Sequence, residues 1–447
     1  MKRSGVPHSL PVPSLPRIQN DGRAARSGAP GGLLGLSVRK NAIWSLVGNG
    51  GFAACQLGML VVLARLGTQE LVGRYAFGLA ITSPIFLFFS LQLRTLLAAH
   101  ASDDADFNVY LTVRLITTAM ATAVVALIGW RHASLDAATV IVAIGLSKAI
   151  DSLHDVVYGL YWRCNRMDYI AISMLVRGTG GLAAFALTFQ LTRSVNAAVV
   201  SLSAIWLLVF AAYDGPVAAR LTPVGSTPWW NLPWSSAMAK RLIWLGFPAG
   251  ILSWLVSLQI YAPRYFVQHE LGEGPLGVFS ALAAIFIGLE LVARSFNHAA
   301  VPRLAKFAAS RQSAALFRLV RQLTQFGILL SALLIAGSIV LGRPLISLLF
   351  GASYAEHSHL FTILSFGFAI RTATMPTAMT LRAVNAYWSL AGVQLLAVAG
   401  LSVACMAWVP LYGLQVLFIL SACLRLGAST LALRLQVVSP SQTRACE

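Results

Sequence analysis

The stretch that decides the fold is residues 141–178, IVAIGLSKAIDSLHDVVYGLYWRCNRMDYIAISMLVRG. It begins as an apolar run that is long enough, as a helix, to cross a bilayer. Lys148, Asp151 and Asp155 interrupt this run at spacing i, i+3, i+7, so a helix places them on one face. Charged side chains are costly in hydrocarbon. This face is therefore predicted to look into protein or a wet cavity and not into lipid.

The end of this run has the composition of a membrane border. Tyr161, Trp162 and Arg163 combine aromatic and basic side chains, as is typical where a helix meets the lipid headgroups. A short basic turn with Arg166 follows, and a second apolar span then carries Arg177 inside it. The sequence thus places charged side chains at depths in the membrane where their burial costs free energy. This placement indicates a functional site.

The composition indicates a polytopic membrane protein. Of the 447 residues, 57% are hydrophobic and 11% charged, with a mean hydropathy of +0.73, whereas soluble domains carry about 25% charged residues. The formal charge is +18, but the basic residues are spread between apolar spans, as in cytoplasmic loops and not as in a nucleic-acid site. The five cysteines show no CxxC spacing and the histidines no HExxH, so we expect neither a disulfide framework nor a metal site.

The pattern of apolar spans predicts an all-α membrane protein with about twelve transmembrane helices, in two six-helix lobes around a central cavity. The spans lie near residues 41–65, 74–97, 109–130, 137–162, 168–191, 194–213, 241–263, 275–298, 323–342, 358–381, 386–408 and 411–434. The domain organisation that follows is a disordered basic tail at 1–38, an N-lobe at 39–213, a linker at 214–240, a C-lobe at 241–436 and a tail at 437–447.

Two further patterns support this organisation. About twenty Lys and Arg residues fall on the side of the N-terminal tail and about six on the other, which predicts that both termini are cytoplasmic. A weak repeat relates Gly73-Arg74-Tyr75-Ala76 to Gly277-Val278-Phe279-Ser280, 204 residues later. It favours two parallel lobes; chance similarity between apolar helices is the alternative.

Several basic residues fall inside the predicted spans: Arg94, Arg114, Lys148, Arg177, Arg294, Arg371 and Arg425. Extension of the side chain to the inner headgroups fits Arg94 and Arg114 well, and fits the deeper residues less well. Isolated cations at depth need acids, carbonyls, water or an anionic substrate.

Few carboxylates are available at these depths. They are Asp151, Asp155 and Glu290, of which Glu290 has the spacing of an ion pair with Arg294, and Asp151 that of a pair with Lys148. Because cations outnumber them, the interior is predicted to be net positive and to suit a diphosphate headgroup, which arginine binds bidentately. A carboxylate in such a cavity could also carry a proton, so Asp155, Glu290 and Asp151 are the candidates for the coupling ion. Pro84, Pro248, Pro263 and Pro376 predict kinks in the spans.

The sequence resembles the Wzx-type polysaccharide flippases of the multidrug/oligosaccharidyl-lipid/polysaccharide exporter (MOP) superfamily, over about residues 39–436. The segments that carry the resemblance are Ser147–Asp151, Tyr158-Gly159, Arg163, Arg166–Ala171, Ser173, Arg177-Gly178, Leu91–Arg94, Val301–Lys306 and Arg343–Gly351.

The resemblance implies transport of an undecaprenyl-diphosphate-linked oligosaccharide from the inner to the outer leaflet of a bacterial inner membrane, driven by an H⁺ or Na⁺ gradient and without a cofactor. The cavity cations Lys148, Arg177, Arg294, Arg371, Arg425 and Arg94 would then bind the substrate. Partners would be the membrane lipids and a polysaccharide polymerase with its chain-length machinery.

Two other classes of function remain open. A drug or cation antiporter of the same fold would need an acidic or apolar cavity. A membrane-bound glycan polymerase, ligase or glycosyltransferase could use Asp104-Ala105-Asp106 as a metal-binding DxD, but no soluble domain surrounds it and a solvated acidic turn explains it. We therefore expect a transporter and not an enzyme.

Overall fold

The computed structural model describes residues 35–99, 107–131, 135–222, 236–286 and 312–383, with shorter pieces around 288, 304–310 and 391–403. The predicted twelfth span, Glu290, Arg294, Arg425, the Asp104–Asp106 motif and both tails lie outside the described residues, apart from residues 35–38 of the first tail.

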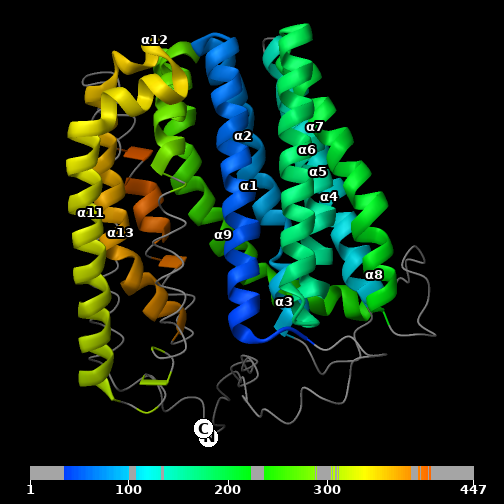
Figure 1. Ribbon diagram of the computed structural model, residues 1–447. Helices are drawn as coiled ribbons and strands as arrows, with labels where there is room; N and C mark the ends of the chain where they lie inside the picture. The colour runs from blue at the N-terminus through cyan, green and yellow to red at the C-terminus, as the bar shows by residue number, and fades with distance from the viewer. Residues whose placement is uncertain are drawn as a thin grey trace, which may run out of the picture. The chain divides into compact units, whose positions relative to one another are not determined.

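The described residues fold into helices, and strands are absent from these parts of the chain. The helices are α1 (Val38–Leu66), α2 (Gln69–Phe89), α3 (Leu93–Ala99), α4 (Phe107–Trp130), α5 (Leu135–Arg163), α6 (Met167–Thr192), α7 (Val195–Val209), the π-helix η2 (Phe210–Asp214), α8 (Gly215–Leu221), α9 (Ser236–Leu271), α11 (Ser313–Phe350), α12 (Ala352–Ala355) and α13 (Ser358–Ala383). A further apolar helix spans Glu273–Phe286. The long helices run roughly alongside one another (Figure 1).

Seven of the described helices are long and apolar enough to cross a membrane. Many of their large apolar side chains are exposed: Leu191 is 75% exposed and Val340 73%. A helix satisfies its own backbone hydrogen bonds, so lipid can contact such side chains directly. The fold is thus the predicted all-α, multi-pass membrane type.

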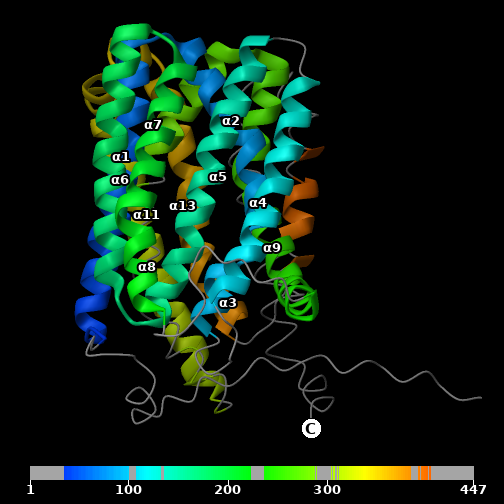
Figure 2. The same ribbon diagram turned by 90° about the vertical axis from the view of Figure 1, so that its right-hand side faces the viewer.

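Helix α5 is the centre of the first half of the chain. It packs on α2, α3, α4 and α7, while α1 packs along α6 and α11 along α13; Figures 1 and 2 show α1 beside α6. Helix α9 packs mainly on α2. Because α5 has neighbours on several sides, its charged face is enclosed by protein.

Local signals explain several helix ends. Thr68 begins α2 and Ser194 begins α7, and each side-chain oxygen accepts a hydrogen bond from a backbone N–H three residues later. Helices α2 and α3 are separated by Leu91 and Gln92, both in the left-handed region at φ 47° and 49°. The predicted span at 74–97 is therefore broken, and the chain turns before Arg94.

The sixth span continues beyond its predicted end at 213. Helix α7 passes through the π-helix η2 into α8, which ends at Leu221. Asp214, expected at the start of the linker, is therefore inside a continuous helical segment and fully buried. Pro216 lies at the start of α8, and proline is well tolerated in the first turn of a helix.

The repeat at residues 73 and 277 coincides with a reciprocal backbone contact. A Cβ at Gly73 would collide with the carbonyl oxygen of Glu273, and a Cβ at Gly277 would collide with that of Gln69. Residues 69 and 273 are also 204 positions apart, so the two contacts are related by the same offset as the sequence repeat. Only glycine permits two helices to approach this closely.

Candidate functional site

A polar cavity of about 690 Å³ lies within the first half of the chain, with one residue of α9 at its wall. It is lined by Phe52, Ser83, Phe86, Leu87, Ser90, Gln92, Arg94, Thr95, Arg114, Lys148, Asp151, Ser152, Asp155, Tyr158, Trp162, Met174, Arg177 and Tyr261. Lys148, Asp151 and Asp155 all line it, so the predicted common face of α5 looks into a cavity and not into lipid.

Arg177 of α6 is the most enclosed cation of the cavity. Its Nη1 donates to Oδ1 of Asp151 at 2.7 Å, and its side chain is 3% exposed. Its guanidinium carbon lies 4.4 Å from the ring centre of Phe52 and 5.0 Å from that of Trp206. Asp151 thus pairs with Arg177, and not with Lys148 in the intrahelical pair that the spacing suggested.

Asp155 lies between two arginines. Nη2 of Arg114 is 2.7 Å from Oδ2, and Nη1 of Arg94 is 3.7 Å from Oδ1. Arg114 also donates to the backbone carbonyls of Ser90 at 3.0 Å and Ser152 at 2.9 Å.

The expectation that Arg114 extends to the headgroups is wrong, because its side chain is 4% exposed and its hydrogen bonds are directed inward. The break after α2 contributes to this arrangement, since the Ser90 carbonyl lies in the turn, where it accepts from the Leu93 N–H at 3.0 Å and also from Arg114.

The cavity has an excess of positive charge. Four cations (Arg94, Arg114, Lys148 and Arg177) and two carboxylates (Asp151 and Asp155) line it, so two positive charges are in excess. Among the described residues, no hydrogen bond or ion pair is found for the side chain of Lys148, although its charge acts on Asp151. The site can therefore attract an anion without first losing an existing bond to Lys148.

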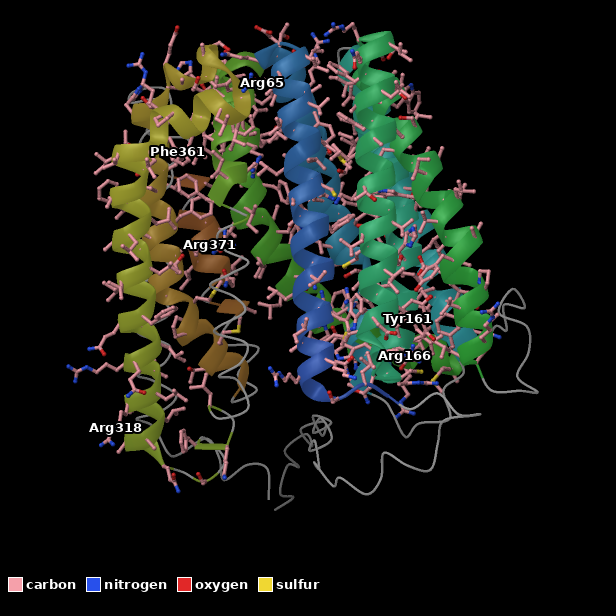
Figure 3. The ribbon with its side chains drawn as sticks, in the orientation of Figure 1. Arg65, Tyr161, Arg166, Arg318, Phe361 and Arg371 are labelled. Atoms are coloured by element: carbon pink, nitrogen blue, oxygen red, sulfur yellow. The ribbon has the colours of Figure 1, made fainter. Side chains whose placement is uncertain are left out.

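Of the other predicted cations, the structure describes Arg371, which does not line this cavity. Arg371 lies on α13 and is absent from the lining (Figure 3). Glu290, Arg294 and Arg425 lie outside the described residues. In the parts of the chain that the structure describes, no group of three or more His, Cys, Asp or Glu side chains is arranged to hold a metal.

A buried polar network behind the cavity wall was not predicted. His154 and Asp214 are both fully buried, with Nδ1 2.8 Å from Oδ2. Ser173 donates to the same carboxylate at 2.7 Å, and Tyr161 donates to it at 3.1 Å. Tyr158 Oη lies 2.8 Å from Ser173 Oγ, and Tyr158 lines the cavity. The network therefore connects the π-helix to the cavity wall.

Hydrogen bonding fixes the protons of this network. His154 Nε2 lies 3.1 Å from the Trp206 carbonyl, which can only accept, so Nε2 carries a hydrogen. A second proton must lie between Nδ1 and Oδ2, because a bare carboxylate cannot face a nitrogen lone pair at this distance. The pair is thus neutral overall, which lowers the free-energy cost of burying it in a membrane segment.

A second basic cluster lies at the turn between α5 and α6. Arg166 donates to both carboxylate oxygens of Asp168, at 2.9 and 2.7 Å, and lies over the ring of Tyr169. The hydrogen bond with Asp168 raises the pKa of Arg166 above its ordinary value. Figure 3 places Arg166 at the end of the structure opposite to Arg65, and the cavity lining reaches Trp162, next to this end of α5.

Polar contacts join the two halves of the described chain at the opposite end. Arg65 donates to the carbonyls of Ser347, Leu348 and Leu349 at the end of α11. Arg74 pairs with Glu273 at 2.6 Å, next to the reciprocal glycine contact. These contacts join the first half of the chain to the second, and none of the residues that make them lines the polar cavity.

Solved transporters of the MOP superfamily share this helical membrane fold. The structure is similar to an inward-facing multidrug resistance transporter of the MATE family, with a TM-score of 0.69 and 13% identity over 89% of this chain and 98% of that one. An outward-facing MATE structure gives 0.60 at 12% identity, over 90% and 95% of the two chains. A MOP transporter from Pyrococcus furiosus, described by the reversed polarity of its binding pocket, gives 0.63 at 13% identity, over 90% and 95% of the chains.

Sequence comparison then identifies the family. Residues 38–308 match the family described as polysaccharide biosynthesis protein, and the chain belongs to it. It is also 29% identical to the capsular polysaccharide biosynthesis protein CapF of Staphylococcus aureus, over 73% of this chain and 81% of that protein. The resemblance to the polysaccharide flippase family is confirmed.

Proposed function

We propose that this chain is a flippase that moves an undecaprenyl-diphosphate-linked oligosaccharide from the inner to the outer leaflet of a bacterial inner membrane. The observation that carries the proposal is the positive excess in the polar cavity. A diphosphate is a compact dianion or trianion, and guanidinium groups bind it through paired, charge-assisted hydrogen bonds. A cavity for organic cations would need the opposite sign, which disfavours the drug antiporter.

In this proposal the cavity residues have different roles. Lys148 and Arg94 receive the diphosphate first, because Lys148 is free of bonds and Arg94 holds Asp155 only at 3.7 Å. Arg177 is bound to Asp151 and contributes mainly its field. Arg371, Arg294 and Arg425 bind the substrate from the second lobe, and the sugars occupy the polar space while the lipid chain stays in the bilayer.

The two carboxylates supply the coupling to an ion gradient. A diphosphate that contacts Arg94 competes with Asp155 for this cation. An Asp155 that loses a partner in a partly enclosed site binds a proton or Na⁺ more readily. Asp151 binds the coupling ion in the same way when its contact with Arg177 weakens. Glu290 has this role in the second lobe. Substrate release then restores the ion pairs.

The direction of transport follows from the same features. The cavity lining reaches Trp162, next to the Arg166 end, where the basic loops of the positive-inside pattern fall, and we place this end and both termini in the cytoplasm. The higher similarity to an inward-facing than to an outward-facing relative supports this choice. Alternating access then requires the contacts at the Arg65 end to separate.

Replacing Lys148 by Gln tests the proposal with little risk to the fold. Lys148 makes no bond that would be lost, so the protein level should stay normal while surface polysaccharide falls by about tenfold or more, since the lost contact to a phosphate is worth at least ~1.4 kcal/mol. The matched control is Arg318→Gln, at an exposed cation of α11 that does not line the polar cavity.

Complementation of a deletion strain and quantification of surface polysaccharide give the measurement. Normal export by Lys148→Gln and by a Lys148→Gln/Arg94→Gln double variant would refute the cationic-cavity mechanism. Drug sensitivity of the deletion strain, without a polysaccharide defect, would favour the antiporter.

A further inference from the structure

A second cavity of about 750 Å³ lies on the other side of α2 from the polar cavity. Its walls come from α2, α4 and α9, and most of its lining is apolar, including Phe77, Ile81, Leu127, Trp254 and Leu258. The three helices are membrane-spanning by length and composition. Of its lining residues, Leu127 is 51% exposed and Tyr265 52%, so a bilayer chain can reach the lining without crossing a polar surface.

The polar groups of this cavity gather at one end. Arg131 follows directly after α4, and Gln268 and His269 lie in the last turn of α9. His269 is engaged by the Glu270 carboxylate at 2.9 Å. Among the described residues, no hydrogen bond or ion pair is found for the side chain of Arg131, whose residue is exposed. The cavity is thus an apolar trough with one free cation at the level where a membrane helix ends.

From this arrangement we infer that the cavity binds an anionic phospholipid, with an acyl chain between α2, α4 and α9 and its phosphate on Arg131. Apolar depth and a cation at the border match the two parts of such a lipid. A sugar-bearing carrier fits less well, because the described lining offers polar side chains only at this rim. The inference depends on the membrane-spanning fold and not on the proposed cargo.

The lipid would act on the polar cavity through α2. Pro84 lines the apolar cavity, whereas its neighbour Ser83 lines the polar one. Proline removes the backbone hydrogen bond to residue 80 and weakens the helix here. An acyl chain packed against this point supports the wall that separates the two cavities, so lipid composition would affect transport.

Native mass spectrometry of the purified full chain tests this inference. The probes are dioleoyl phosphatidylglycerol and dioleoyl phosphatidylcholine, which differ in charge and not in chains. We expect wild type to retain one phosphatidylglycerol more strongly than phosphatidylcholine, and Arg131→Gln to reduce this retention about five-fold, the factor for one basic residue at a membrane surface. Arg343→Gln, at an exposed cation near the same end of the helices, should change nothing.

A cavity-filling variant separates the contribution of the apolar cavity to lipid binding from the contribution of the Arg131 charge. Ile81→Trp occupies the apolar space and should weaken retention of both lipids, while Leu333→Trp adds the same bulk on an open face of α11, where Leu333 is 64% exposed. Leu258→Phe is a milder filling variant if Ile81→Trp does not fold.

The inference is overturned if both lipids are retained equally and Arg131→Gln has no effect. It is also overturned if the filling variants retain phosphatidylglycerol as wild type does, or if undecaprenyl phosphate displaces phosphatidylglycerol at equal concentration. None of these outcomes bears on surface polysaccharide in Lys148→Gln, so failure here and failure of the flippase proposal can be told apart.

Discussion

At the scale of single residues, the burial of Asp214 depends on a shared proton. The carboxylate accepts from Ser173 and Tyr161 and shares a proton with His154, so every partner in the network depends on it. The pair is neutral, and an isosteric neutral side chain can replace the acid if it supplies the matching hydrogen bonds.

We therefore expect Asp214→Asn and Asp214→Ala to differ sharply. The Asn amide can donate to a neutral His154, so its melting temperature should stay close to that of wild type. Alanine leaves His154, Ser173 and Tyr161 without their acceptor and should cost about 3 kcal/mol or more. Thermal unfolding in detergent measures both. Equal losses in the two variants would show that the carboxylate charge itself is required.

Two residues show where prediction from sequence stops. Lys148, Asp151 and Asp155 could be assigned to one face because helical spacing alone fixes it. The partners of Arg114 could not be assigned, because they include Asp155, 41 residues later, and the Ser90 carbonyl in the turn after α2. The depth of a cation in a membrane span indicates that it needs a partner, but it does not indicate which of the neighbouring groups is that partner.

At the scale of elements, the close approach of α2 to the helix Glu273–Phe286 rests on two glycines. The repeat at 73 and 277 could be read from the sequence, since it is a matter of residue identity at a fixed offset. The backbone contact between the two copies could not, because it depends on how the halves pack. The extension of the sixth span to Leu221 was missed because the span was placed as an apolar run of about 20 residues ending at 213, whereas the helical segment continues past it.

Gly73→Ala should therefore destabilise the protein by about 1–3 kcal/mol, the usual range for forcing extra atoms into a packed contact. The collision is with a backbone carbonyl, which cannot rotate away as a side chain can. The control is Gly50→Ala in α1, where nothing lies within 4 Å and where alanine should be neutral or stabilising by up to ~1 kcal/mol. Thermal unfolding of both variants is the measurement; equal midpoints would contradict the contact.

At the scale of the whole molecule, the cavity lining reaches the Arg166 end, while the two halves of the described chain are joined at the Arg65 end. In a background with all five cysteines replaced, Arg74→Cys/Glu273→Cys places two thiols where an ion pair now stands. Cross-linking should hold this end closed and abolish surface polysaccharide, and a reductant should restore it, because alternating access needs the contact to open. Each single-cysteine variant should export with or without oxidant. Unchanged export by the cross-linked protein would exclude separation at this point.

The paired glycines also set how closely the two halves can be joined. A Cβ on either glycine would collide with a carbonyl oxygen of the opposite helix. A side chain at position 73 or 277 would therefore widen the spacing between α2 and the helix Glu273–Phe286, and with it the distance between Arg74 and Glu273. The ion pair at this end is thus formed at a spacing that both glycines allow.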